Sequence, residues 1–381
     1  MRSRTATTAV GVLKSTDGGD TWTLQGAADF TGESFFRIAV NPTTPTTLFA
    51  ATSKGIYRSA NGGANWTQMT GGLPAISATV LGATDVVIDP ATPTTVYAAF
   101  WSNGIYKTIN ANAANPSWSK LAGGLPSGAT MGRIGLGISV TSPQTLYAAF
   151  GTNLYFTTNG GTNWNAISMP TDFSVDEYGN NVAVDPTTPD IVYLSGYPDL
   201  WKASRNPVTG VWTVSNIGSS IHPDNHAFAF DPTNHLAIYA GSDGGIYKSI
   251  NGGSTWTDTI NRGLCLTQFE FIDQHPSSDA VIFGGTQDNG TEQFRNSLVH
   301  YHADDGDGGY VAVDQSQPRN VLHVYYNRSL ARSTAAGGFG TWSDVKAGLA
   351  GSPIFYPPFV LNQANPNEIA YGTDRINLDA T

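Results

Sequence analysis

The sequence predicts an all-β protein built as a β-propeller, and three observations lead to this prediction. The 381 residues include 43 Gly and 21 Pro, too many for a mainly helical chain. The 29 acidic residues are 24 Asp and only 5 Glu, and Asp favours turns whereas Glu favours helices. A motif ending in tryptophan recurs every 44 to 52 residues up to position 256, a period typical of propeller blades.

Composition excludes several classes of protein. A charged fraction of 13% with 40% hydrophobic residues excludes a disordered chain. The net charge of −10, without any Lys/Arg-rich run, argues against nucleic acid and anionic membranes as partners. No segment approaches the ~20 apolar residues of a membrane span. The one cysteine, Cys265, cannot form an intramolecular disulfide and is expected in the core. A Thr/Asn/Gly-rich, Lys-poor composition favours an extracellular or cell-surface location, although the first residues lack the apolar stretch of an export signal.

The recurring motif is a polar, Gly-Gly turn that leads into a tryptophan. Clean copies end at Trp22, Trp66, Trp164 and Trp256, and degenerate copies end at Trp118, Trp212 and Trp342. The acid position of the clean copies holds Asp17, Asn61, Asn159 and Asn251. Such a side chain can accept hydrogen bonds from the backbone N–H groups of its own turn, and the tryptophan is expected to pack against the adjacent blade. Because Asn cannot act as a general acid, we interpret the motif as structural.

A second motif has the same period and reads apolar-apolar-Asp-Pro-x-x-Pro-x-x-apolar-Tyr, as in the stretch that ends at Tyr193. Together the two motifs predict four strands for each blade of about 39–52 residues. In the first full blade these are an inner strand (residues 37–40), a second strand (47–51), a third strand (55–59) and a fourth strand that carries Trp66.

Counting the two motifs predicts the number of blades. Seven copies of the second motif are followed by a tryptophan motif, whereas the eighth, at residues 359–372, is not. The first tryptophan motif, at Ser15, has no second motif before it. Joining residues 9–24 to residues 359–376 completes one blade and leaves no open sheet edge. The chain is therefore expected to be a single propeller over residues 1–381, with eight blades and a closing blade shared by the two termini; seven blades is the alternative.

The tryptophan motif resembles the Asp-box (BNR repeat), S-x-D-x-G-x-T-W, of sialidases, sortilin-type receptors and xyloglucanase-type hydrolases. This resemblance covers nearly the whole chain. It implies a propeller in which each box is a turn between the two outer strands, and it implies little about activity. Trp101 and Trp201 lie outside the boxes and are candidates for exposed rings that stack on sugars.

Function is expected where the repeat is broken. All seven histidines follow position 221, and the sharpest cluster is His222-Pro223-Asp224-Asn225-His226, directly before an inner strand. If this segment is extended, His222, Asp224 and His226 share one face at the entrance of the central channel. They would then bind a ligand or metal ion, or else form a polar cluster that ties the strand to its neighbours.

The next stretch, Ser242-Asp243-Gly244-Gly245-Ile246-Tyr247-Lys248, is similar to the D-V-G-G-x-Y-R element of xyloglucanase-type hydrolases. That resemblance implies that Asp243 serves as a catalytic base, with Asp224 as a candidate partner. One residue is missing between Asp243 and the glycines, and Gly-Ile-Tyr also occurs at Gly55 and Gly104. Those hydrolases use two propellers with a cleft between them, whereas this chain has the length of one.

Two irregular Gly-rich loops complete the candidate ligand-binding residues, which are Asp288 in the first loop and His300, His302, Asp304 and Asp307 in the second. Asp304, Asp305 and Asp307 are spaced like oxygen ligands of Ca²⁺, which makes Ca²⁺ the candidate cofactor, although the Glu of a 12-residue calcium loop is missing. Solvated turn acids are the alternative.

These observations favour an exported propeller that binds a glycan or a protein on the irregular face of its C-terminal blades. The alternative is a polysaccharide-active glycoside hydrolase with paired Asp carboxylates. A sialidase is disfavoured because Ala39 stands where the F-R-I-P motif of that family has proline. A sortilin-type receptor would need a cysteine-rich module, which one cysteine cannot form. The sequence leaves the oligomeric state open.

Overall fold

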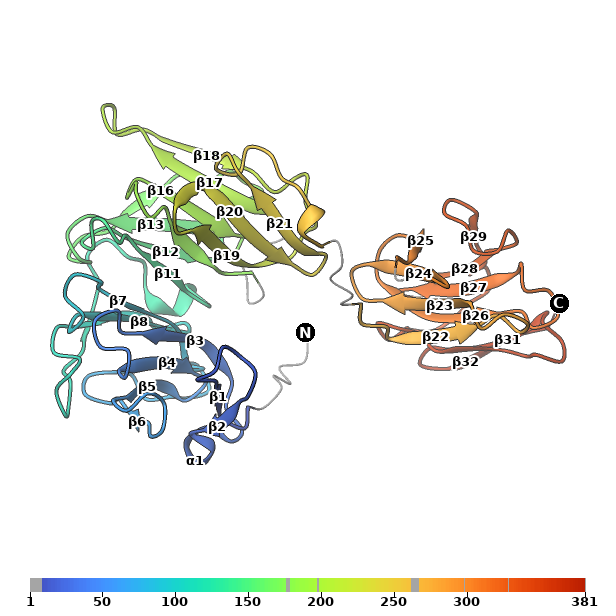
Figure 1. The fold of residues 1–381 in the computed structure, drawn as a ribbon, viewed down its shortest axis with the longest axis horizontal. Coiled ribbons are helices and arrows are strands. Elements are labelled where there is room, and N and C mark those ends of the chain that lie inside the picture. The colour runs from blue at the N-terminus through green and yellow to red at the C-terminus, as the bar shows by residue number, and fades with distance from the viewer. Residues whose placement is uncertain are drawn as a thin grey trace. The chain divides into compact units, whose positions relative to one another are not determined.

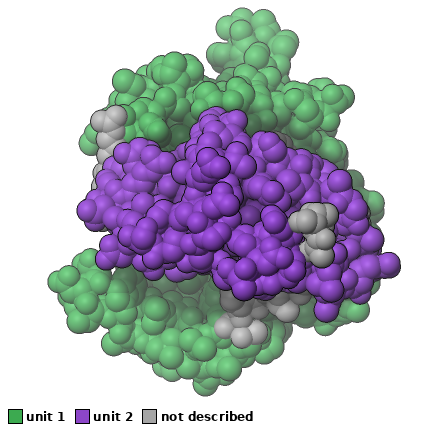
Figure 2. Space-filling model, turned by 90° about the vertical axis from the view of Figure 1, so that its right-hand side faces the viewer, with its two compact units in different colours: residues 1–260 green, residues 261–381 purple. Residues whose placement is uncertain are grey.

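The structure is a computed structural model that describes residues 9–175, 179–196, 199–261, 267–297, 299–327 and 329–380. The chain divides into two compact units, residues 1–260 and 261–381, which are described separately below (Figures 1 and 2). In these ranges the strands form nine antiparallel sheets, six of them with four strands, and helix is limited to three short turns. The predicted all-β propeller class is confirmed. Cys265 lies outside the described residues.

The first unit begins with a hairpin and one short helix, followed by five sheets. The hairpin and helix are β1 (Val12–Lys14), β2 (Thr23–Gln25) and α1 (Ala27–Phe30). The first two sheets contain β3 (Phe35–Val40), β4 (Leu48–Thr52), β5 (Gly55–Ser59) and β6 (Thr67–Gln68), then β7 (Ala83–Ile88), β8 (Val96–Phe100), β9 (Gly104–Thr108) and β10 (Ser119–Lys120). The 3₁₀ turn η1 (Gly128–Thr130) precedes β11 (Gly135–Ile138), β12 (Leu146–Phe150), β13 (Asn153–Thr157) and β14 (Asn165–Ile167). The last two sheets contain β15 (Val182–Val184), β16 (Ile191–Ser195), β17 (Leu200–Arg205) and β18 (Trp212–Asn216), then β19 (Asn225–Asp231), β20 (Asn234–Ser242) and β21 (Gly245–Ser249), before η2 (Thr259–Asn261).

The second unit contains three sheets. These are formed by β22 (Phe271–Gln274), β23 (Val281–Thr286), β24 (Gly290–Arg295) and β25 (Tyr301–Asp304); by β26 (Gly308–Val313), β27 (Val321–Tyr325), β28 (Ser329–Ser333) and β29 (Trp342–Asp344); and by β30 (Phe359–Leu361), β31 (Glu368–Gly372) and β32 (Ile376–Ala380).

Each sheet is a meander in which strands pair in chain order, as propeller blades require. In the first unit the inner strands β3, β7, β11 and β15 follow one another side by side, and the β19–β21 blade continues the series (Figure 1). That last blade has three strands, and a single bridge between Lys248 and Thr257 stands in the fourth position.

The closing blade stays a prediction. Within the second unit, β31 pairs with β30 along one edge and with β32 along the other. β32 is therefore the third strand of this sheet. The two-stranded β1–β2 sheet contains the first tryptophan motif. Neither the joining of residues 9–24 to 359–376, nor the count of eight blades, nor a single domain over residues 1–381 is tested by these sheets.

The core lies between facing sheets of adjacent blades. Phe49 and Ile56 of the β3–β6 blade pack with Val86 and Phe100 of the β7–β10 blade, and all four are buried. Burying large apolar side chains in this way is the main force that holds neighbouring blades together, at about 1.5–3 kcal/mol for each fully buried side chain.

Two tryptophans depart from expectation. Trp22 is 58% exposed, so its ring does not pack against a blade as we expected, because the β1–β2 sheet has only two strands. Trp201 is 3% exposed and its ring packs edge-on against Phe173. The prediction that Trp201 is an exposed sugar-stacking ring is therefore wrong. Its side chain points into the core between two blades, a direction that the repeat pattern did not reveal.

The four clean tryptophan motifs share one hydrogen bond. The side-chain oxygen of Asp17, Asn61, Asn159 or Asn251 accepts from the backbone N–H four residues later, at 2.9 to 3.0 Å. Asp and Asn can both make this bond, which explains why the position tolerates either residue. Hydrogen bonds from Thr21 and Ser15 lower the pKa of the exposed Asp17 carboxyl far below its usual value.

A second contact joins these turns to the preceding blade, and we call it the interblade contact. Tyr97 and Lys107 pair across β8 and β9, and the tyrosine hydroxyl and the lysine Nζ both donate to the carbonyl oxygen of Gly160, at 3.2 and 2.9 Å. Tyr193 and Lys202 make the same two bonds to Gly252, at 3.5 and 3.1 Å. Both glycines have a positive φ, which few other residues adopt without strain.

Candidate functional site

The inner strands of the first unit carry bulges at one end. In β3, β7 and β19 the pairing register shifts by one residue, which leaves Phe36, Thr84 and His226 as the extra residues. A β-bulge bends its strand and redirects the side chains around it. Three separate blades therefore use the same backbone device at corresponding positions.

The bulges border a polar pocket of 320 Å³. Its walls come from five successive blades, and they include Arg37, Asp85, Arg133, Asn180, Asn181 and His226. The volume lies near the lower end of the roughly 300–1,000 Å³ that small-molecule sites occupy.

Asp85 is the buried acid of this pocket. Its carboxylate lies 3.3 Å from Arg37 Nη1 and accepts hydrogen bonds from the backbone N–H groups of Leu136 and Val86, both at 2.7 Å. Burial raises the pKa of the Asp85 carboxyl, and the charge of Arg37 opposes that rise. Asp85 thus joins β3, β7 and β11, and it fixes the position of Arg37 in the pocket wall.

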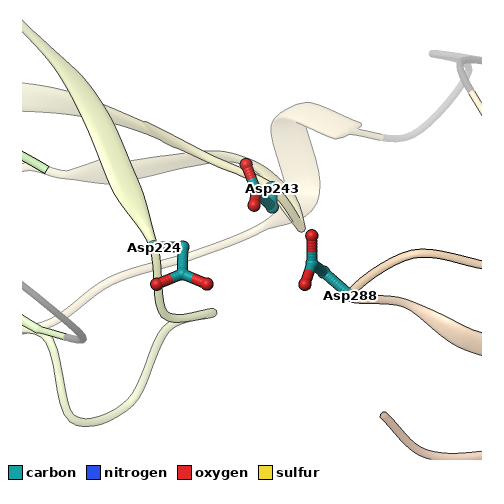
Figure 3. A group of neighbouring side chains, drawn as sticks. All are labelled: Asp224, Asp243 and Asp288. Carbon is teal, nitrogen blue, oxygen red and sulfur yellow. The ribbon is translucent and has the colours of Figure 1, made fainter. Parts of the chain in front are cut away.

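His226 connects the pocket to a pair of carboxylates. Its Nε2 lies 2.8 Å from Oδ1 of Asp243, which stands in the turn between β20 and β21. An oxygen of Asp224 and an oxygen of Asp243 lie within 4.8 Å of each other (Figure 3). The Asp243 side chain is 18% exposed and that of His226 is 35% exposed, so both are partly shielded from water yet reachable. We call Asp224, Asp243 and His226 the paired-carboxylate site.

His222 packs against the turn that carries Asp243. Its Nδ1 donates to the Pro223 carbonyl at 3.0 Å, and its carbonyl accepts from the Asn225 side chain at 3.2 Å. The ring lies so close to Gly244 that a Cβ at position 244 would collide with it. Glycine after Asp243 is therefore required for the His222 ring to pack against the turn.

The expectation that His222, Asp224 and His226 share one face of an extended segment is wrong. β19 begins only at Asn225, and Asp224 has a φ of 58°, in the left-handed region. His226 is the extra residue of the β19 bulge. The simple alternation of side chains fails because neither residue has regular strand geometry. Strain of about 1–3 kcal/mol at a left-handed non-Gly residue is typical of functional sites.

The second unit holds the other candidate residues, and Asp288 and Asp307 lie together there. Asp288 has a φ of 63° in the turn between β23 and β24, and its backbone N–H donates to Asp307 Oδ1 at 3.0 Å. The buried hydroxyl of Tyr356 lies near both acids. Burial, with the charge of Asp307, raises the pKa of Tyr356 well above its usual value.

The remaining candidates form contacts within the second unit, and the contact of Asp304 reaches the next blade. His302 Nδ1 and Nε2 each lie 2.8 Å from a carboxylate, of Glu292 and of Asp305 respectively. Asp304 lies 3.1 Å from the buried His323. The ring of His300 packs against Phe269. The three acids proposed as Ca²⁺ ligands, Asp304, Asp305 and Asp307, thus have three different partners, and Ca²⁺ binding stays a prediction.

Sequence reasoning missed Asp85, Arg133 and Asn181 as members of the pocket. One signal was present in the sequence. Asp85 directly precedes the apolar run Val86-Val87-Ile88, and a charged residue is rarely buried beside such a run unless it is paired. Arg133 and Asn181 have no such signal, since they reach the pocket only through the arrangement of blades.

Comparisons with known proteins were made for the whole chain. No protein-family model matches it. A probable oligoxyloglucan-reducing end-specific xyloglucanase of Neosartorya fischeri is 24% identical in an alignment 370 residues long, which covers 88% of this chain and 43% of that protein. Among solved structures, an ancestral GH74 enzyme is 14% identical, with a TM-score of 0.49 over 96% of this chain and 64% of that one. A GH74 enzyme of Niastella koreensis is 14% identical, with a TM-score of 0.45 over 89% and 62%.

No helix in the described ranges is both long enough and apolar enough to cross a membrane. An extracellular location stays a prediction. The chain spans less than half the length of the curated xyloglucanase that it matches.

Proposed function

We propose that this chain is a polysaccharide-active glycoside hydrolase, with Asp224 and Asp243 as its two catalytic carboxyl groups. The observation that carries the proposal is their proximity, with one oxygen of each within 4.8 Å. Glycoside hydrolases that retain the anomeric configuration use two carboxyl groups only about 5–5.5 Å apart, and the two groups flank one glycosidic bond. The likeness to a xyloglucanase supports this activity over binding alone, and it makes a β-glucan backbone the first substrate to test.

The two carboxyl groups take different parts in the proposed reaction. Asp243, hydrogen-bonded to His226, attacks the anomeric carbon while Asp224 gives a proton to the departing glycosidic oxygen, so that the glycosidic bond breaks and a glycosyl ester of Asp243 forms. Asp224 then removes a proton from the water that hydrolyses this ester and frees Asp243. Each hydrolysis consumes one water and produces one new reducing end.

The pocket beside His226 provides the binding surface in this proposal. Arg37, Asn180 and Asn181 offer donors and acceptors of the kind that fix sugar hydroxyls. Asp85 and the β3 bulge position Arg37, and the side chains of Asn180 and Asn181 donate to the carbonyl oxygens of Arg133 and His226 at 3.1 and 3.4 Å, so the pocket is preformed. A preformed pocket lowers the entropic cost of orienting a sugar beside the carboxyl groups.

The test is a panel of polysaccharides, including xyloglucan, scored for new reducing ends with and without EDTA. The proposal expects release that persists in EDTA and disappears in Asp224→Asn and in Asp243→Asn. Asp20→Asn is the matched control, because Asp20 is an exposed acid of the first unit far along the chain from this site. Retention of a polysaccharide without release would support the binding function instead. Release that EDTA abolishes would assign the chemistry to a metal ion.

A further inference from the structure

A groove of 770 Å³ lies in the second unit, where the β22–β25 blade meets the β26–β29 blade. It is formed at the end of β23 and β24 where Val281 pairs with Arg295, and Asp288 lies in the turn at the opposite end of the same strands. The groove is therefore distinct from the acids Asp288 and Asp307. Its volume is within the roughly 300–1,000 Å³ range of small-molecule sites.

The interblade contact is missing beside this groove. In the first unit, Tyr97 and Lys107 face each other across two strands and both donate to Gly160. The corresponding pair in β23 and β24 is Phe283 and Gln293, and the corresponding residue of the next turn is Ala336. Phenylalanine lacks the hydroxyl and glutamine lacks the ammonium group, so neither of these two bonds can form.

All three substituted positions line the groove. Phe283, Gln293 and Ala336 each contribute to its wall. Ala336 also has a φ of 56°, in the region where the other turns have glycine. At this seam the repeat is thus altered in three places, and each altered residue faces the same space.

The charge of the groove is opposite to that of the chain. Arg295, Arg319 and His275 line it, and no Asp or Glu does so among the residues that the structure describes. The whole chain has a net charge of −10. Nε of Arg295 donates to Gln293 at 2.7 Å and the guanidinium lies 4.7 Å above the Tyr301 ring, so this side chain is held in place. None of the ion pairs found in the described ranges of the chain involves Arg295 or Arg319.

We propose that this groove binds a saccharide that carries a carboxylate, such as a uronic acid residue. Arginine guanidinium groups bind carboxylates through paired, charge-assisted hydrogen bonds. Ser277 and Gln317 offer hydrogen bonds to sugar hydroxyls, and Pro318 offers an apolar surface to a sugar ring. The groove is independent of the paired-carboxylate site, so it binds its ligand whether or not the chain hydrolyses glycans.

Isothermal titration calorimetry with digalacturonic acid tests this site, with cellobiose as the neutral probe of equal length. We expect digalacturonic acid to bind and cellobiose to bind at least tenfold more weakly. The double variant Arg295→Gln/Arg319→Gln should bind digalacturonic acid at least tenfold more weakly than the parent chain does. Arg375→Gln removes an exposed arginine of the same unit that lies outside the groove. The affinity of this variant for digalacturonic acid should stay within twofold of that of the parent chain.

A second variant separates a shaped site from simple charge attraction. Phe283→Tyr/Gln293→Lys restores both donors of the interblade contact and fills the groove, while adding one positive charge. We expect this variant to bind digalacturonic acid at least tenfold more weakly and to have a higher melting temperature than the parent chain. Stronger binding by this variant would overturn the proposal, as would equal binding of the two disaccharides or no effect of the arginine substitutions. Equal binding of a tetra-aspartate peptide would overturn the saccharide class.

Discussion

His226 Nε2 lies 2.8 Å from Asp243 Oδ1, and this bond connects a bulged inner strand to the turn that follows the next strand. The bond orients the carboxyl group of Asp243 through its Oδ1 atom. It also places the pair beside the polar pocket, because His226 belongs to both. His226 is therefore a positioning residue in the proposed reaction.

Replacing this histidine tests that role. We expect His226→Gln to lower kcat on the order of 100-fold with a smaller change in KM, because a misplaced carboxylate loses transition-state alignment more than substrate binding. His300→Gln is the control, since His300 packs against Phe269 in the second unit. Equal losses in kcat and in the Tm of both variants would show that His226 serves folding alone.

Asp85 should be more important for stability than any surface acid. Asp85→Ala leaves two buried N–H groups without their acceptor and Arg37 without its counter-charge. We expect the free energy of unfolding to fall by about 2–6 kcal/mol, because each buried donor left without an acceptor costs about 1–3 kcal/mol. Urea denaturation monitored by tryptophan fluorescence measures this change. A loss below about 1 kcal/mol would mean that water replaces the carboxylate.

Two buried tyrosine hydroxyls that donate to the next blade predict a graded series. Tyr147 is fully buried and donates to the Pro189 carbonyl at 2.7 Å, whereas Tyr193 reaches Gly252 at 3.5 Å. Tyr147→Phe should cost about 1 kcal/mol of unfolding free energy, near the usual value of one hydrogen bond, and Tyr193→Phe should cost less. Urea midpoints of the two variants, each compared with the parent chain, give the order. The reverse order would contradict the geometry.

His302 should make stability depend on pH. Partial burial disfavours its charged form, but the hydrogen bonds to Glu292 and Asp305 outweigh this and raise the pKa of His302 above its model-peptide value of about 6.5. A raised pKa in the folded state means that the contribution is complete below about pH 6.5 and is lost as the pH rises through the folded-state value. The stability difference between the parent chain and His302→Gln should therefore be larger at pH 5.5 than at pH 9. A stability difference that does not change with pH would contradict the raised pKa of His302 in the folded state.

The sequence predicted those parts of the fold that depend on local chemistry. Turn residues and strand periodicity placed the third strand of the first full blade at residues 55–59, where β5 lies, and placed the Asn-capped turns correctly. The direction in which Trp201 packs depends on the neighbouring blade, so local pattern could not reveal it.

The site was predictable only in part, for the same reason. Asp224, Asp243 and His226 stood out because they interrupt a repeat, but the geometry that joins them uses a left-handed residue and a bulge. Neither feature has a period in the sequence. Asp85 and Arg133 enter the pocket from separate blades, more than 40 residues apart in the chain, and only the packed structure brings them to one place.

The central claim is that Asp224 and Asp243 act together on one glycosidic bond, and a kinetic comparison of three variants tests it most directly. Initial rates of reducing-end release would be measured for Asp224→Asn, Asp243→Asn and the double variant on the best substrate of the panel. Residues that act as a unit are not additive, so each single variant should lose about 10³-fold or more in kcat and the double variant should be no slower than the worse single variant. A single variant with near-parental kcat, or losses that multiply in the double variant, would contradict the account.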